Sequence, residues 1–242
     1  MELLPHLTYD ASVLSITPAQ WRAHQDSSFP ARCSHTITKL RDSLFLIGGG
    51  ACDVTRTWTH YGDVMVNRST LTEDGSAWAV LATSDGSSLP ARRGHSAVVR
   101  AGSILVFGGT MGGPAMEGGN RNDVWEFNTE DRTWREVVTR GEPPPARRGH
   151  QAVLVEGEMW VLGGYTDALD ENCWALAWSD ENSPPTWCPV RCSGEHPRLI
   201  ALFSAELLGN VVFVFGGHAV QQGQAFSELN PDPNSALALT LI

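Results

Sequence analysis

The fold is decided by a stretch that recurs along the chain: Pro90-Ala91-Arg92-Arg93-Gly94-His95, then Ile104-Leu105-Val106-Phe107, then Gly108-Gly109. Counterparts of the opening are Pro30-Ala31-Arg32-Cys33-Ser34-His35 and Pro145-Ala146-Arg147-Arg148-Gly149-His150, with a degraded copy at Pro197-Arg198. Glycine pairs that close an apolar run recur at steps of 60, 55 and 53 positions: Gly48-Gly49, Gly108-Gly109, Gly163-Gly164 and Gly216-Gly217. A spacing in this range is typical of the blades of a β-propeller.

The second half of each repeat carries an acidic or amide residue and then a lone tryptophan. The first marker is Asp63-Val64, Asn122-Asp123-Val124-Trp125 or Asn172-Cys173-Trp174. The tryptophans, at steps of 57, 56 and 53, are Trp21, Trp78, Trp134 and Trp187. Turn residues separate four extended runs in the best copy: 95–99, 104–107, 124–128 and 133–138. Each repeat therefore predicts one four-stranded antiparallel blade, which is stable only when neighbours cover both of its faces.

This combination of an Arg-x-x-His opening, an apolar strand ending in Gly-Gly, an Asp or Asn and a spaced Trp resembles the Kelch motif. The chain is identified as a member of the Kelch-repeat β-propeller family, whose repeats are like those of the central domain of galactose oxidase. The resemblance implies an all-β propeller fold, and counting the extended runs of this chain gives about four and a half blades. They are a half blade at 1–25, blades at 30–82, 90–138 and 145–190, and a degraded last blade at 197–242, with 225–230 and 236–241 as its outer strands.

Kelch rings usually close with more blades than this, by pairing strands from the two termini. We therefore predict a single propeller array that forms an open or incomplete ring. The N-terminal hairpin should lie exposed on one side and the last blade should be poorly formed. Exposed edges of such a ring predict self-association or a partner that supplies further blades.

The repeated residues have structural roles that require no ligand. The glycines of each pair permit positive φ where inner strands crowd together. The tryptophans Trp78, Trp134 and Trp187 offer apolar area that fills the wedge between blades. The repeated Arg and His side chains can satisfy turn carbonyls and carboxylates such as Asp63 and Asp123.

Net charge, the N-terminal residues and the cysteine content indicate the class of partner, the cellular compartment and the state of the thiols. The formal net charge of -10 repels phosphate backbones and anionic lipid, so we expect no nucleic acid and no membrane as partner. The first twenty residues lack a basic start and a long apolar run, which predicts a cytoplasmic protein. Five cysteines at irregular spacing predict reduced, packed thiols rather than a disulfide framework.

The leading function is recognition of a protein partner through the loops, which differ between blades. The double arginines occupy equivalent points of successive blades, so we predict that all four face solvent as a basic crescent. Kelch domains that bind acidic peptides use arginines near this strand opening, and the resemblance implies the same role here. At least one arginine per blade is expected to be structural. The candidate partner-binding residues are Arg32, Arg92, Arg93, Arg147, Arg148 and Arg198.

Two alternatives stay open, a Kelch-type enzyme that acts on a small molecule at the loop face and a purely structural repeat. The copper chemistry of galactose oxidase depends on tyrosines and histidines in particular loops, and none of Tyr9, Tyr61 and Tyr165 lies in a matching motif. Zinc is considered at Cys188, Cys192 and His196, with Cys173 nearby, but the spacing is wider than a usual zinc knuckle. We predict no catalytic residue, no metal and no cofactor.

Overall fold

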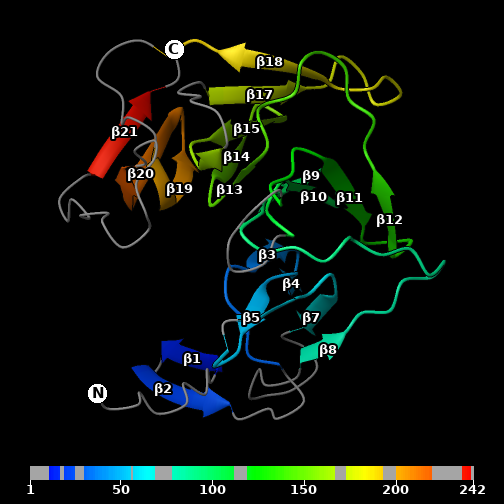
Figure 1. Cartoon of the computed structure of the whole chain (residues 1–242), viewed down its shortest axis with the longest axis vertical. Helices are drawn as coiled ribbons and strands as arrows, with labels where there is room; N and C mark the ends of the chain where they lie inside the picture. The colour runs from blue at the N-terminus through cyan, green and yellow to red at the C-terminus, as the bar shows by residue number, and fades with distance from the viewer. Residues whose placement is uncertain are drawn as a thin grey trace.

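The structure, a computed structural model, describes residues 11–16, 19–24, 30–55, 57–68, 78–111, 119–166, 173–192, 200–219 and 236–240. All regular structure in these ranges is β-strand, arranged as a series of antiparallel sheets along an arc (Figure 1). The same ranges hold no helix that is long and apolar enough to cross a membrane.

Each complete repeat forms one four-stranded sheet. Blade 1 consists of β3 (Thr36–Leu40), β4 (Ser43–Ile47), β7 (Val64–Arg68) and β8 (Trp78–Val80). Blade 2 consists of β9 (Ser96–Arg100), β10 (Ser103–Phe107), β11 (Val124–Asn128) and β12 (Thr133–Glu136). Blade 3 consists of β14 (Gln151–Val155), β15 (Glu158–Leu162), β17 (Cys173–Ala177) and β18 (Thr186–Val190). The strands of blade 2 agree, within two residues at each end, with the four runs expected at 95–99, 104–107, 124–128 and 133–138.

The two ends of the arc carry smaller sheets. At one end, β1 (Ala11–Ile16) pairs with β2 (Ala19–His24). At the other end lies blade 4, with β19 (Ile200–Leu208), β20 (Val211–Ala219) and β21 (Ala236–Thr240). Here β21 pairs directly with β20 and so takes the third place in the blade. Residues 225–230, which the sequence pattern predicts for that place, lie outside the described residues.

The blades follow one another through their innermost strands, because β3 contacts β9, β9 contacts β14 and β14 contacts β19. Figure 1 shows the β1–β2 sheet and blade 4 at opposite ends of the arc. Among the described strands, β1 pairs with β2 alone and β20 pairs with β19 and β21, so no strand pairing closes a ring. An open Kelch-type propeller, as the repeat count predicts, is confirmed.

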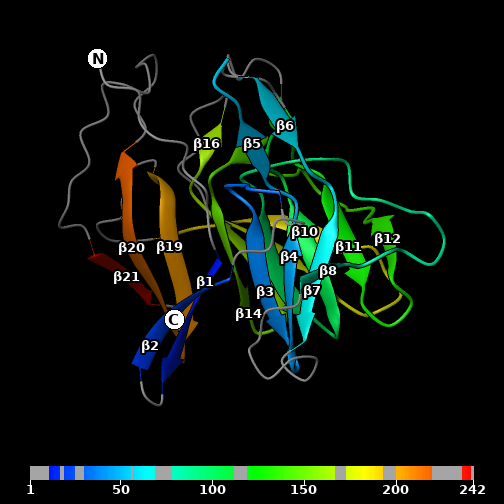
Figure 2. The ribbon, with the colours of Figure 1, turned by 90° about the horizontal axis from the view of Figure 1, so that it is seen from below.

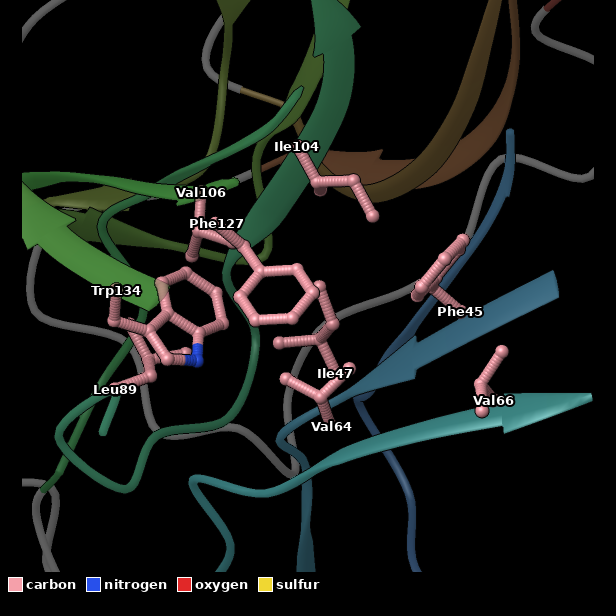
Figure 3. Close-up of a cluster of buried hydrophobic side chains, with 9 residues drawn as sticks. All are labelled: Phe45, Ile47, Val64, Val66, Leu89, Ile104, Val106, Phe127 and Trp134. Carbon is pink, nitrogen blue, oxygen red and sulfur yellow. The ribbon is translucent and has the colours of Figure 1, made fainter. Parts of the chain in front are cut away.

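The hydrophobic core lies in the wedges between blades. Between blades 1 and 2, Ile47 and Val64 face Phe127 and Trp134, whose ring centroids are 5.0 Å apart (Figure 3). The next wedge contains Trp187, whose ring lies 5.1 Å from that of Phe107. The predicted wedge position is therefore confirmed for Trp134 and Trp187, and each blade is stabilised by its neighbour.

Two additional pairs of short strands lie at one end of the four-stranded sheets. They are the hairpin of β5 (Gly50–Cys52) and β6 (Trp58–His60), and the pair of β13 (Arg147–Arg148) and β16 (Tyr165–Thr166). Figure 2 shows β5, β6 and β16 at the same end of the stack. We call this end the loop face and define it by residues 30–35, 48–55, 57–63, 90–95, 108–111, 119–123, 145–150 and 163–166.

Candidate functional site

The first arginine of each repeat is part of the fold. The Arg92 guanidinium donates to both carboxylate oxygens of Asp123, at 2.7 and 2.8 Å, and to the carbonyl oxygens of Gly108 and Pro90, at 2.9 and 3.0 Å. Arg32 makes the same bidentate pair with Asp63, at 2.6 and 3.0 Å. These are the carboxylates that the sequence predicts as partners of the repeated arginines.

Arg147 repeats the pattern of carbonyl contacts, with donors 3.1 Å from the Pro145 oxygen and 2.9 Å from the Gly163 oxygen. Both Arg92 and Arg147 are fully buried, and Arg32 is buried as well. Burial raises the pKa of Asp123, but the hydrogen bonds and positive charge of Arg92 outweigh it and lower the pKa overall. These arginines therefore act as internal clamps.

The prediction that all four paired arginines face solvent is wrong. Arg92 and Arg147 point into the sheet stack, and Arg93 retains an exposed fraction of only 8 %, while Arg148 is half-buried. The physical reason is that a bidentate carboxylate and turn carbonyls bind the first guanidinium better than water does. Arg198, the remaining candidate, lies outside the described residues.

The second arginine of each pair, Arg93 or Arg148, extends its side chain to a loop of the preceding blade. Arg93 forms a bridge with Thr110 of its own blade, but its guanidinium stacks 3.8 Å from the Trp58 ring centroid and its Nε donates to His60. Arg148 donates to the side-chain oxygen of Asn120 at 2.9 Å. The structure thus places Arg93 and Arg148 on the loop face, each against a neighbouring blade.

Aromatic rings support these two guanidiniums. Trp58 and His60 lie on β6 and stack on each other with ring centroids 6.2 Å apart. Tyr165 on β16 lies under Arg148, whose guanidinium carbon is 4.9 Å from the ring centroid. Burial and the charge of Arg93 lower the pKa of His60, so this imidazole is neutral and accepts from Arg93 at neutral pH. The sequence pattern did not single out Trp58 and His60, because they lie in a loop whose residues are not repeated in the corresponding loops of the other blades.

The histidines of the repeat link adjacent blades. His95 Nε2 lies 3.0 Å from the Thr36 hydroxyl, and His150 Nε2 lies 2.9 Å from the Ser96 hydroxyl. Burial and the nearby Arg92 lower the pKa of His95 to about 3, and burial lowers that of His150 well below its usual value. Both imidazoles are therefore neutral structural groups.

A chain of backbone hydrogen bonds shows where the degraded fourth copy aligns. Gly94 N–H donates to the Ser34 oxygen, Gly149 N–H to the Gly94 oxygen and Leu202 N–H to the Gly149 oxygen, each at 2.8 Å. All four residues have positive φ, between 55° and 65°. Leu202 is therefore the counterpart of Gly149, a step of 202 − 149 = 53, which equals the glycine step 216 − 163.

This alignment corrects the fourth copy of the motif. A Cβ on the second glycine of a pair would lie 2.7 Å from the His150 Cβ at Gly164, and 2.8 Å from the Phe203 Cβ at Gly217. Phe203 thus occupies the place of the histidine, and Ile200 that of the first arginine. The sequence pattern predicted the fourth copy of the opening at Pro197-Arg198, and this prediction is wrong. The constant step of 53 residues is the signal in the sequence that identifies the correct alignment.

The cysteines and tyrosines show no assembled catalytic centre in the described part of the chain. Those residues contain no group of three His, Cys, Asp or Glu side chains placed to hold a metal ion. Of the proposed zinc set, His196 is outside the described residues, while the Cys192 and Cys173 sulfurs are 3.5 Å apart. Tyr61 lies under Arg32, with its ring centroid 4.1 Å from the guanidinium carbon. Tyr9 also lies outside the described residues.

The consecutive four-stranded sheets with Gly-Gly turns define the class of this protein, a propeller of Kelch-type blades. A family model described as the KLHDC2/KLHL20/DRC7 Kelch-repeats domain matches residues 6–217, and the chain belongs to this Kelch-repeat family.

Similar proteins come from animals and plants. The chain is 31% identical over 214 residues to an F-box/kelch-repeat protein of Arabidopsis thaliana, covering 81% of this chain and 41% of that protein. It is 27% identical over 218 residues to Kelch domain-containing protein 3 of Bos taurus, covering 82% and 50%. It is also 27% identical over 192 residues to the Leucine-zipper-like transcriptional regulator 1 homolog of Drosophila melanogaster, covering 78% and 18%. The chain thus spans no more than half the length of these relatives.

A solved structure described as "Structure of YjhT" has a similar fold. It superposes with a TM-score of 0.66 at 15% identity, covering 88% of this chain and 69% of that chain. At this identity the likeness shows the propeller fold alone.

Proposed function

We propose that this chain is a protein-interaction module whose loop face binds an acidic peptide segment of a partner protein. Relatives with Kelch repeats support an interaction module in general terms. The proposal of an acidic peptide rests on the positions of Arg93 and Arg148. Unlike Arg92 and Arg147, these two arginines do not act as internal clamps but lie against aromatic rings of the loop face.

The geometry of Arg93 supports a role in binding carboxylates. Its Nε is 3.2 Å from the His60 Nε2, and no carboxylate of the described residues forms an ion pair with it. Because only 8 % of Arg93 is exposed, a carboxylate must reach it between the loop-face side chains, but it would displace no internal ion pair there. A carboxylate that approached Arg92 would have to displace Asp123. Stacking on Trp58 restricts the rotamers of Arg93, which lowers the entropy cost of binding.

The test is a pull-down from native extract with the full chain, in which Arg93→Glu and Arg148→Glu are combined. We expect this variant to lose the proteins that the unchanged chain retains, because both guanidiniums become like-charged to an acidic segment. The matched control combines Arg41→Glu and Arg135→Glu, whose side chains are 76% and 75% exposed and lie away from the loop face. It makes the same change in net charge and should retain the partners.

Recovery should also fall as the salt concentration rises, since exposed charge pairs are screened. The proposal would be contradicted if the loop-face variant and its control recovered the same amount of partner protein while circular dichroism showed both to be folded. The two arginines would then not contribute to partner binding.

We propose in addition that the outer face of blade 4 mediates association between copies of this chain. Large apolar side chains remain exposed on this face, with exposed fractions of 48% for Phe213 and 69% for Phe215. Exposed apolar side chains that adjoin one another favour contact with another protein surface.

A further inference from the structure

Two of the five cysteines have their sulfur atoms in contact. Cys173 is the first residue of β17, and Cys192 lies two residues beyond the end of β18. Their Sγ atoms are 3.5 Å apart, both residues are half-buried, and neither is part of a disulfide bond. A disulfide bond needs about 2.05 Å between the sulfurs, so an approach of about 1.5 Å would join them.

Strand pairing explains why these two thiols meet. Cys173 is paired with Val190, so the two side chains lie on the same face of blade 3. Side chains alternate along a strand, which places a residue two beyond Val190 on that face again, as the diagonal neighbour of Cys173. The Cys192 Sγ also lies 4.0 Å from the Val190 oxygen, which keeps it beside the sheet.

The position of the pair adds a mechanical consequence. Cys173 packs against the apolar cluster that joins blades 3 and 4, which contains Phe203 and Val212. Cys192 lies on the connection that leads from β18 to β19 and so to blade 4. A covalent bond between them would fix the start of this connection to the sheet of blade 3.

We propose that Cys173 and Cys192 form a reversible disulfide when the protein meets a hydroperoxide, which makes this pair a thiol modification site. The Cys192 thiolate attacks one peroxide oxygen of hydrogen peroxide, the O–O bond breaks, and water leaves after proton uptake. The product is a sulfenic acid on Cys192. The Cys173 thiolate then attacks the Cys192 sulfur and displaces hydroxide, which takes up a proton and leaves as the second water.

In this sequence two thiols are oxidised to one disulfide, and one hydrogen peroxide molecule is reduced to two water molecules. We assign the first attack to Cys192 because it lies beyond the strand end, while Cys173 packs against the core. A dithiol reductant reverses the step by thiol–disulfide exchange.

The experiment uses the purified, reduced full chain, treated with stoichiometric hydrogen peroxide, alkylated with N-ethylmaleimide and digested for mass spectrometry. We expect a linked peptide pair that contains Cys173 and Cys192 and has lost two hydrogen atoms. It should be absent from Cys173→Ser and from Cys192→Ser, and restored to free thiols by dithiothreitol. Cys188→Ser is the matched control, because Cys188 pairs with Ala175 on the same two strands and should leave the link intact.

A second readout tests the mechanical consequence. The oxidised protein should have a Tm roughly 5–10 °C above that of the reduced protein, because a short cross-linked loop restricts the unfolded chain. The Tm of Cys192→Ser should not respond to peroxide in this way. Linkage of Cys173 to Cys188, or over-oxidation of Cys192 with no linked peptide, would overturn the proposal.

Discussion

The two adjacent arginines of a repeat have opposite environments, and this difference separates structure from recognition at the scale of the residue. Arg92 is fully buried and forms a bidentate pair with Asp123, while Arg93 reaches a neighbouring loop. Successive side chains of an extended segment point to opposite sides, so only one of the two can enter the sheet stack. The sequence predicts that one arginine is structural, but it does not specify which one, because two equal residue types stand side by side.

Removal of the buried guanidinium should destabilise the protein strongly. In Arg92→Ala, the half-buried Asp123 carboxylate loses its bidentate cationic partner and keeps only the Trp125 indole N–H as a side-chain donor, and the Gly108 oxygen loses a donor. We expect the free energy of unfolding in urea to fall by about 3–5 kcal/mol. Arg135→Ala is the control, because Arg135 is 75% exposed in its ion pair with Glu126 and should cost less than about 1 kcal/mol. Equal losses in the two variants would contradict the clamp role of Arg92.

At the scale of the element, the repeat pattern predicts the three complete blades and the wedge positions of Trp134 and Trp187. This succeeds because each blade needs the same turns and the same apolar faces, so its residues recur at a constant step. Blade 4 is where the pattern fails. Its entry residue in the left-handed region is Leu202 rather than glycine, and Phe203 replaces the histidine, so the motif is not visible in residue types. The contacts of Trp58 and His60 with Arg93 also escape prediction, since they join a unique loop to another blade.

The histidine links between blades predict a dependence of stability on pH. His95 has a folded pKa of about 3, below its unfolded value near 6.5, so between these values the unfolded state binds more protons. The contribution of His95 is complete above pH 6.5 and is lost as the pH falls toward 3. It should amount to about 2 kcal/mol between pH 7 and pH 5.

Urea unfolding at pH 7 and pH 5 measures this effect. His95→Gln should show a smaller drop in stability between the two pH values, because the glutamine side chain does not titrate. If the unchanged protein and His95→Gln lose the same stability, the neutral His95 that bonds to Thr36 is not the source of the pH dependence.

At the scale of the whole molecule, the outer face of blade 4 is equivalent to faces that are buried elsewhere in the arc. Phe213 and Phe215 stand three and one positions before the first glycine of their pair. In blade 2 the same positions are occupied by Leu105 and Phe107, which are 3% and 0% exposed because blade 3 covers them. The face of blade 4 thus has the composition of an inter-blade contact and leaves Phe215 69% exposed.

Self-association through this face should be visible in static light scattering over a series of protein concentrations. We expect the apparent mass of the unchanged chain to rise with concentration, since burying a phenylalanine side chain contributes roughly 1.5–3 kcal/mol. The double variant Phe213→Ser and Phe215→Ser should keep the mass of a monomer, and because both side chains are exposed, it should retain its fold. The control combines Val54→Ser and Val138→Ser, which are 90% and 74% exposed but lie outside blade 4, and it should associate like the unchanged chain. A monomer mass for the unchanged chain at every concentration would refute this role, because the exposed phenylalanines would then mediate no contact between copies.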